Sequence, residues 1–129
     1  MAKIERFEDL EVWKISRDFA KSIYLVLEND GFLHNFRFRD QIRASAGSIM
    51  DNIAEGFERE GNKEFIQFLF VPKGSCGETR SQLYRALDVG YISEEVFQPL
   101  YQESVRISQS LSGFIQYLKS SGIKGPKYK

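Results

Sequence analysis

Two stretches almost free of bulky side chains, Ala44-Ser45-Ala46-Gly47-Ser48 and Gly74-Ser75-Cys76-Gly77, flank the turn signal Gly61-Asn62 at similar distances. If the segments on either side of this turn are antiparallel helices, the two stretches face each other. Small side chains let two helix axes approach more closely than the usual separation of about 8–10 Å. We therefore predict that the two helices touch there. The residues predicted to form this close helix contact are Gly47, Ser48, Gly74 and Gly77.

The composition indicates one globular domain without a strong overall charge. The chain has 129 residues, 42% of them hydrophobic, which suffices for one core but not for two ordinary domains. Its 18 basic and 18 acidic residues balance, so nothing attracts the whole chain to nucleic acid or to an anionic membrane. After Glu103, however, five basic residues and no acidic residue give a local charge of +5. A lone cysteine and the lack of a leader or long apolar span near Met1 predict a cytoplasmic protein.

Apolar residues recur with a helical period along the whole chain, and no stretch alternates as a half-buried strand does. The predicted helices span about 8–28, 37–59, 63–89 and 93–120. Helices of this length with short joints predict an all-α fold, an antiparallel up-down-up-down four-helix bundle over residues 1–121. Residues 122–129 are predicted to be a basic, flexible tail. Pro72 should kink the third helix, while Gly90 and Ser93 suit a C-terminal cap and an N-cap.

The last predicted helix has a wider apolar surface than one bundle seam requires. Its main stripe follows a heptad pattern through Phe97, Leu100, Ser104, Ile107, Leu111, Phe114 and Leu118. Tyr101, Ile115 and Tyr117 extend the apolar surface beyond that stripe, and the remaining positions are mostly serine and glutamine rather than charged residues. This extra face either contacts another subunit, which predicts a homo-oligomer, or is exposed to water.

Residues that could support catalysis do not occur in a productive spacing. The single histidine, His34, lies in a predicted loop without the Glu-x-x-His spacing of di-iron bundles. Gly56-x-x-x-x-Gly61-Asn62-Lys63 is similar to a phosphate-binding loop, but Asn62 separates the Gly-Lys pair and no strand precedes it. Cys76 lies among small residues with Arg80 as a weak cationic neighbour, which fits a core residue better than a reactive thiol. We predict no enzyme activity, no metal and no cofactor.

Polar residues adjoin apolar positions of the second and third predicted helices, which indicates partial burial. These residues are Arg43, Asn52, Glu55, Glu78 and Arg80. The register that aligns the two small stretches also places Arg43 opposite Glu78. Because buried charges persist when they are paired and hydrogen-bonded, our main interpretation is a network that fixes helix register or a subunit contact. The alternatives are a carboxylate site and the recognition of a ligand or partner.

Three strings resemble a known bacterial family of four-helix bundles. They are the string from Gln41 through Asn52-Ile53-Ala54-Glu55-Gly56, then Glu64-Phe65-Ile66-Gln67-Phe68-Leu69, and Lys73-Gly74-Ser75-Cys76-Gly77-Glu78-Thr79-Arg80-Ser81-Gln82-Leu83-Tyr84. The family includes proteins encoded in intervening sequences of large-subunit ribosomal RNA genes, sometimes labelled ribosomal protein S23-like. The resemblance extends from Leu10-x-Val12-Trp13 to Leu87-Asp88-x-Gly90-Tyr91-Ile92, so it covers nearly the whole chain.

This resemblance implies a small, cytoplasmic, nonenzymatic homo-oligomer. A related accessory protein of diversity-generating retroelements is a basic pentamer that binds nucleic acid and a reverse transcriptase, so the resemblance also suggests five subunits. The chain departs from the family at Pro72, where alanine is expected, and it lacks the strong basicity of the retroelement branch.

Two classes of function remain. In the first, the oligomer binds structured RNA or DNA through phosphate contacts. The candidate contact residues are Arg37, Arg39, Lys119, Lys124, Lys127 and Lys129. Arg37 and Arg39 oppose the macrodipole at a predicted helix start, so a bound anion would compensate them. In the second class, the protein is a protein-binding scaffold with no nucleic-acid role. Zero net charge favours the scaffold, and the family resemblance favours nucleic-acid binding.

Overall fold

The computed structural model describes residues 4–59 and 61–121. Four long helices and two short ones form this part of the chain, and no strand occurs among the described residues, which confirms the predicted all-α class. The elements are η1 (Phe7–Asp9), α1 (Glu11–Val26), α2 (Asp30–Leu33), α3 (Phe36–Phe57), α4 (Asn62–Asp88) and α5 (Glu94–Ser121). The predicted tail, residues 122–129, lies outside the described residues.

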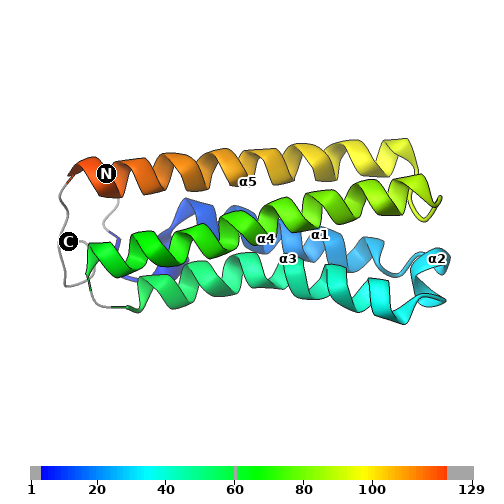
Figure 1. Ribbon diagram of the computed structural model, residues 1–129, viewed down its shortest axis with the longest axis horizontal. Helices are drawn as coiled ribbons and strands as arrows, with labels where there is room; N and C mark the ends of the chain where they lie inside the picture. Colours follow the sequence, from blue (N-terminus) through cyan, green and yellow to red (C-terminus); the bar gives the residue numbers. More distant parts are fainter. Residues whose placement is uncertain (1–3, 60, 122–129) are drawn as a thin grey trace.

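The long helices lie side by side, and each runs in the opposite direction to the long helix before it (Figure 1). Helix α3 contacts both α1 and α4, while α5 contacts α4 and α1, so the four helices enclose one core. Helix α2 lies at one end of the molecule, whereas η1 and the end of α5 lie at the other (Figure 1). The start of α3 and the end of α5 therefore lie at opposite ends of the long axis.

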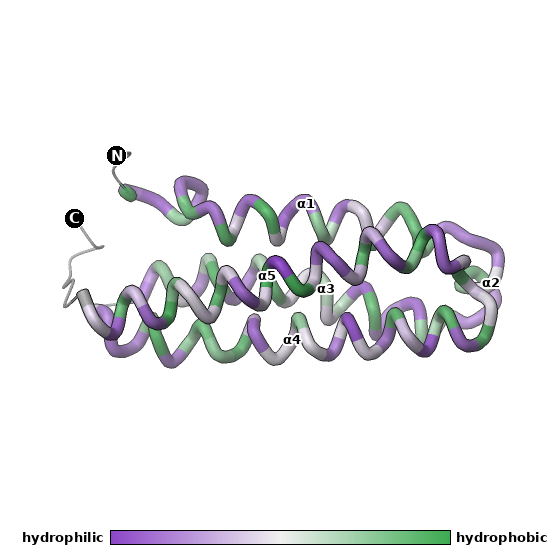
Figure 2. Tube along the Cα trace, turned by 90° about the horizontal axis from the view of Figure 1, so that it is seen from above, coloured by the Kyte–Doolittle hydropathy of each residue, from purple (hydrophilic) through white to green (hydrophobic). Residues whose placement is uncertain are grey.

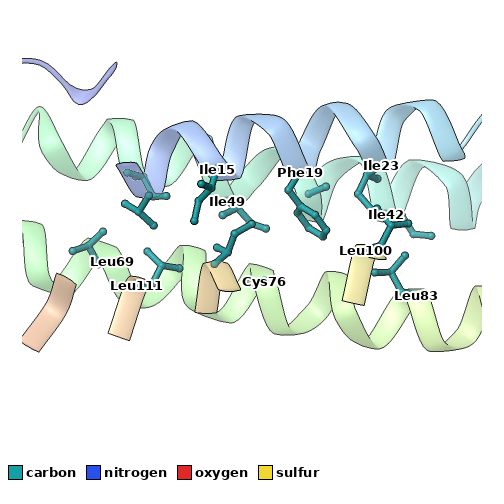
Figure 3. Packing of buried hydrophobic residues seen from close by; sticks show 14 of the residues in the cluster. Ile15, Phe19, Ile23, Ile42, Ile49, Leu69, Cys76, Leu83, Leu100 and Leu111 are labelled. Atoms are coloured by element: carbon teal, nitrogen blue, oxygen red, sulfur yellow. The ribbon is translucent and has the colours of Figure 1, made fainter. Parts of the chain in front are cut away.

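The core contains the residues that the helical period places inward. Hydrophilic and hydrophobic residues alternate along each long helix (Figure 2). Figure 3 shows Phe19 of α1, Ile49 of α3, Leu69 of α4 and Leu111 of α5 at successive levels of the space between the helices, and all four are fully buried. Burial of such side chains stabilises the fold by roughly 1.5–3 kcal/mol each. Ile115 was expected beyond the core stripe of the last helix, but its side chain is 5% exposed and belongs to this core.

Helix ends follow local capping rules. Gly90 has φ 79°, and Tyr91 N donates to Ala86 O at 2.9 Å, which closes α4 as predicted for a glycine cap. The Ser93 hydroxyl accepts a hydrogen bond from Val96 N at 3.2 Å, which confirms Ser93 as the N-cap of α5. Helix α4 continues across Pro72, which is buried, so the expected kink does not interrupt the helix.

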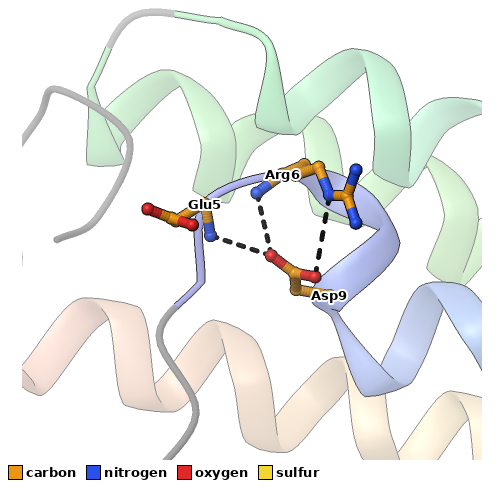
Figure 4. A network of polar contacts seen from close by, with 3 residues as sticks. All are labelled: Glu5, Arg6 and Asp9. Atoms are coloured by element: carbon orange, nitrogen blue, oxygen red, sulfur yellow. Dashed lines mark hydrogen bonds and ion pairs between the residues drawn. The ribbon is translucent and has the colours of Figure 1, made fainter.

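The turn before α1 is fixed by one carboxylate. Asp9 Oδ2 accepts hydrogen bonds from Glu5 N at 3.0 Å and Arg6 N at 3.2 Å (Figure 4). These backbone donors hold the pKa of the Asp9 carboxyl below its usual range. Because the folded-state pKa is lowered, this contribution to stability is present near neutral pH and is lost as the pH falls through that value.

The connection between α1 and α3 is more ordered than the sequence suggested. Phe32 is fully buried in α2, and its ring lies 5.1 Å from the Tyr91 ring and 5.9 Å from the Phe38 ring. A Cβ at Gly31 would overlap the Tyr91 ring, so the close approach requires glycine there. Asn35 Nδ2 donates to Tyr91 Oη at 3.2 Å. These contacts join α2 to the turn between α4 and α5.

Candidate interaction surfaces

A hydrogen-bonded polar seam joins α3 to α4. The Ser45 hydroxyl donates to Gln82 Oε1 at 2.6 Å, and Thr79 Oγ1 donates to Ser45 Oγ at 2.8 Å. Farther along, the hydroxyls of Ser48 and Ser75 lie 3.0 Å apart. Ser45, Thr79 and Gln82 are buried, so their mutual hydrogen bonds offset the cost of removing them from water. The two small stretches do contact each other, but through hydroxyl groups.

The predicted polar network separates into local contacts. Arg43 pairs with Asp40 at 3.5 Å on its own helix, rather than with Glu78, and its guanidinium lies over the Tyr24 ring at 5.6 Å. Glu78 accepts a hydrogen bond from Gln82 at 3.4 Å. The expected Arg43–Glu78 pairing is therefore wrong, because the α3–α4 register is set by the seam and places Ser48 opposite Ser75.

The other predicted network residues also make separate contacts. Asn52 Nδ2 donates to Ser48 Oγ at 2.8 Å and so extends the seam by one turn. Glu55 pairs with Arg59 at 3.2 Å on the exposed side of α3. Arg80 is half-buried near the Cys76 thiol, whose pKa is raised by burial and lowered to a smaller extent by the Arg80 charge. Cys76 Sγ donates to Ser104 O at 3.1 Å, in keeping with an inert core thiol.

The structure corrects the predicted roles of three glycines. No heavy atom of a neighbouring group lies within 4 Å of a Cβ built at Gly74 or Gly77, so neither glycine is at a close helix crossing. A Cβ at Gly47 would meet only Tyr24 Oη, at 3.7 Å, from α1 rather than α4. The glycine at a close α3–α4 approach is Gly56, where a Cβ would lie 2.7 Å from Phe68 Cβ.

The sequence reasoning missed Gly56, Thr79 and Gln82 as contact residues. Thr79 and Gln82 follow Cys76 at steps of three residues, so helical spacing alone places them near the inward face of α4. Gly56 belongs to the pattern similar to a phosphate-binding loop and to the family string, and neither of these predicts a helix contact. Its position as the next-to-last residue of α3 is a signal for a close approach where the two helices converge on their turn.

A shallow groove crosses α1 and α3 on either side of Tyr24. One part, of about 440 Å³, is lined by Asp40, Arg43 and Ser48, and the other, of about 550 Å³, by Arg17, Leu25 and Met50. Tyr24 and Gly47 line both parts. Acidic and basic side chains both occur along the groove, so the groove favours neither a negatively nor a positively charged ligand.

The described candidate contacts for nucleic acid lie at opposite ends of the helical bundle. Arg37 is exposed in the first turn of α3, and Arg39, two residues later, pairs with Glu28 at 3.2 Å. Lys119 lies near the start of α4, because Asn62 Nδ2 donates to the neighbouring Leu118 O at 2.8 Å. The structure therefore does not bring Arg37 and Arg39 together with Lys119. The other candidate contacts, Lys124, Lys127 and Lys129, lie outside the described residues.

Large apolar side chains remain exposed on α4 and α5. Phe70, Tyr84 and Tyr117 expose 50%, 47% and 51% of their surfaces. Tyr84 contacts the Phe97 ring at 4.9 Å, and the Phe70 ring has the Lys119 ammonium 5.7 Å from its centre. Aromatic rings supply a large apolar contact area with a fixed orientation, which suits contact with another protein.

Residues 4–59 and 61–121 contain neither a metal-ligand cluster nor a membrane-spanning helix. No cluster of three or more His, Cys, Asp or Glu side chains in this range is placed to hold a metal ion. None of its helices combines the length and the apolar character needed to cross a membrane.

Comparison with known proteins places the chain in a family. Residues 8–113 match the family model of the 23S rRNA-intervening sequence protein. The chain belongs to this family. A crystal structure of a protein of unknown function from the S23 ribosomal protein family of Bacteroides thetaiotaomicron is also similar. It shares 28% sequence identity and a TM-score of 0.74, over 81% of this chain and 98% of the other. No curated protein matches the chain.

The family membership confirms the resemblance drawn from the sequence strings. The matched family is that of the 23S rRNA-intervening sequence protein, and the similar solved protein is itself of unknown function. The match ends at residue 113 and thus includes the polar seam, the α2 contacts and most of α5.

Proposed function

We propose that this family member is a nonenzymatic, cytoplasmic homo-oligomer that binds proteins as a scaffold. Its protomer is an antiparallel up-down-up-down four-helix bundle. The observation that carries the proposal is the exposure of Phe70, Tyr84 and Tyr117 on the outer sides of α4 and α5. Aromatic residues are enriched at the centres of protein interfaces, where they supply large contact areas.

The arrangement of polar groups supports a structural role over a catalytic one. The buried hydroxyl and amide groups of Ser45, Thr79 and Gln82 hydrogen-bond to one another and so hold two helices in register. Cys76 has a raised pKa, which opposes formation of a nucleophilic thiolate near neutral pH. These groups stabilise the bundle and present no activated side chain to a surface.

Concentration dependence of unfolding tests the homo-oligomer. Because assembly stabilises the folded state by mass action, we expect the thermal unfolding temperature to rise as protein concentration increases from nanomolar to micromolar. Fluorescence of Trp13, which is half-buried against the Phe7 ring at 5.1 Å, follows unfolding across that range. An unfolding temperature that is independent of concentration would contradict the proposal.

Binding of structured RNA or DNA is the second proposed function, and the exposed Arg37 supports it. This side chain lies in the first turn of α3, where the macrodipole disfavours a cation and favours an anion. An oligomer would also multiply the +5 charge that follows Glu103 into a larger basic surface. Five subunits, as the family resemblance implies, would gather five such segments.

A salt-titrated RNA-binding assay tests this second function. We expect affinity to fall steeply with salt, by roughly 0.9 in the log–log slope for each phosphate contact to a duplex. Replacing Lys124, Lys127 and Lys129 together by alanine should reduce both affinity and slope. Replacing Lys14 and Lys21, which are exposed on α1, provides the control and should change both less. Absence of binding at about 50 mM salt would contradict this second function, and the protein-binding scaffold would be the remaining proposal.

A further inference from the structure

A pocket with a largely apolar lining opens at the end of the bundle where η1 and the end of α5 lie (Figure 1). Its larger part has a volume of about 340 Å³, and a narrower part of about 50 Å³ continues to the buried rings of Phe57 and Phe65. Ile4, Leu10 and Phe114 line both parts. Because a cavity of roughly 150 Å³ holds a benzene ring, the larger part has room for one aromatic side chain.

Aromatic rings form much of the pocket wall. The Phe65 ring lies 5.9 Å from the Phe57 ring and 5.5 Å from the Phe114 ring, with interplanar angles of 88° and 80°. The Phe114 ring stacks on the Tyr117 ring at 6.3 Å, and Tyr117 is 51% exposed. Contacts between aromatic rings stabilise an assembly beyond the burial of their area. The pocket therefore favours an aromatic occupant over an aliphatic one.

One buried acceptor beside the pocket lacks a donor. Asn62 Nδ2 donates to Leu118 O at 2.8 Å, and Leu118 lines the narrower part of the pocket. Asn62 Oδ1 is buried and has no hydrogen-bond partner among the described residues. Buried side-chain oxygens in proteins are hydrogen-bonded in the large majority of cases. An N–H group from the chain that follows α5 would satisfy this oxygen.

The chain that follows α5 is long enough to enter the pocket. Phe114 lies seven residues before Ser121, the last residue of α5, which is about 10 Å along the helix axis. Tyr128 lies seven residues after Ser121, so an extended connection spans up to roughly 23–25 Å. Ile123 is only two residues from Ser121 and spans roughly 7 Å, which is too short to return to Phe114. Gly122 directly follows the helix, and glycine at such a position favours a reversal of the chain.

The charges of the pocket rim and of this segment are complementary. Residues 4–12, which form one side of the pocket, include four acidic residues and one basic residue, a net charge of −3. Residues 122–129 include three lysines and no acidic residue. The Glu5 carboxylate points away from Arg6 and Asp9 (Figure 4), and Glu5 and Glu8 form no ion pair within the described part of the chain. Both carboxylates are therefore available to lysines of the segment.

We propose that this pocket binds the chain's own C-terminal segment, residues 122–129, with the Tyr128 ring in its larger part beside Phe114. The lysines of the segment then face the carboxylates of residues 4–12, and a backbone N–H of the segment donates to Asn62 Oδ1. The segment forms a strap across the end of the bundle, in place of the flexible tail that the sequence predicts. This inference goes beyond both proposed functions. Docking also conceals the lysines, so phosphate binding under the second proposed function requires release of the strap.

Trypsin cleavage after Lys124 in the whole chain tests the docked strap, because a protease cuts the released form. We expect Tyr128→Ala to raise the rate of this cleavage about tenfold, since it removes the buried ring. Tyr128→Phe keeps the ring and should keep the native rate, as measured by mass spectrometry. Free peptides of residues 120–129 with either Tyr or Ala at position 128 control for a direct effect on trypsin and should be cleaved at one rate. Equal rates in the native chain and Tyr128→Ala would overturn the proposal.

A disulfide test identifies which copy supplies the strap. Glu5→Cys combined with Lys129→Cys should form an intrachain disulfide under mild oxidation, and adding Tyr128→Ala should slow its formation. Leu25→Cys with Lys129→Cys is the matched control and should stay reduced, because Leu25 is exposed near the other end of α1. The native Cys76 thiol is buried and does not compete. Disulfide-linked dimers in place of the intrachain product would overturn the proposal and assign the pocket to the segment of a second copy.

Discussion

Replacing Gly56 by alanine is expected to lower the free energy of unfolding by about 1–3 kcal/mol, because the added methyl group overpacks the α3–α4 contact. Its Cβ would lie 2.7 Å from Phe68 Cβ and 3.2 Å from Phe65 Cδ1. Phe68 Cβ is attached directly to the α4 backbone and therefore cannot move away alone. Urea denaturation followed by circular dichroism measures the change.

Gly113→Ala is the matched control for Gly56. Gly113 lies in the interior of α5 with open space around its Cα, so alanine should stabilise the helix by about 0.5–1 kcal/mol. The two alanine variants should therefore shift the unfolding midpoint in opposite directions. Equal shifts would mean that α3 and α4 do not approach closely at Gly56.

Gln82→Ala is expected to cost about 1–3 kcal/mol, because it removes the buried amide that accepts the Ser45 hydroxyl at 2.6 Å. Ser45→Ala should cost a similar amount. Since the two side chains contact each other directly, a double-mutant cycle in urea should give a coupling energy of about 0.5–3 kcal/mol.

The control cycle uses Arg43→Ala and Glu78→Ala, the pair that the initial register placed together. Arg43 instead pairs with Asp40, so these two changes should add within about 0.5 kcal/mol. Strong coupling between Arg43 and Glu78, together with additive effects at Ser45 and Gln82, would mean that the α3–α4 register is the one first predicted.

The helices were predictable because each has a long, regular apolar stripe and recognisable ends. The predicted span of about 63–89 differs from α4, Asn62–Asp88, by one residue at each end. Gly90 and Ser93 were found by local rules, since a C-terminal glycine and an N-cap serine act within one turn. Helix α2 was missed, because four residues carry no helical period and its position depends on Phe32 packing against Tyr91.

The side of each helix that makes a contact was harder to predict than the helix itself. The small side chains of this stretch predicted a helix contact at Gly74 and Gly77. The residues that face α3 are instead Ser75 and Thr79, whose hydroxyl groups hydrogen-bond across the helices. A composition rule does not distinguish a glycine at an intrachain crossing from one on an outer face. Ile115 was misplaced for the same reason, since an apolar residue beside a heptad stripe fits either the core or an interface.

The most direct test of the proposed homo-oligomer is the mass of the native chain in solution at micromolar concentration, measured by light scattering. The proposed homo-oligomer predicts a whole-number multiple of 14.9 kDa that corresponds to two or more chains. A mass of 14.9 kDa at that concentration would contradict it.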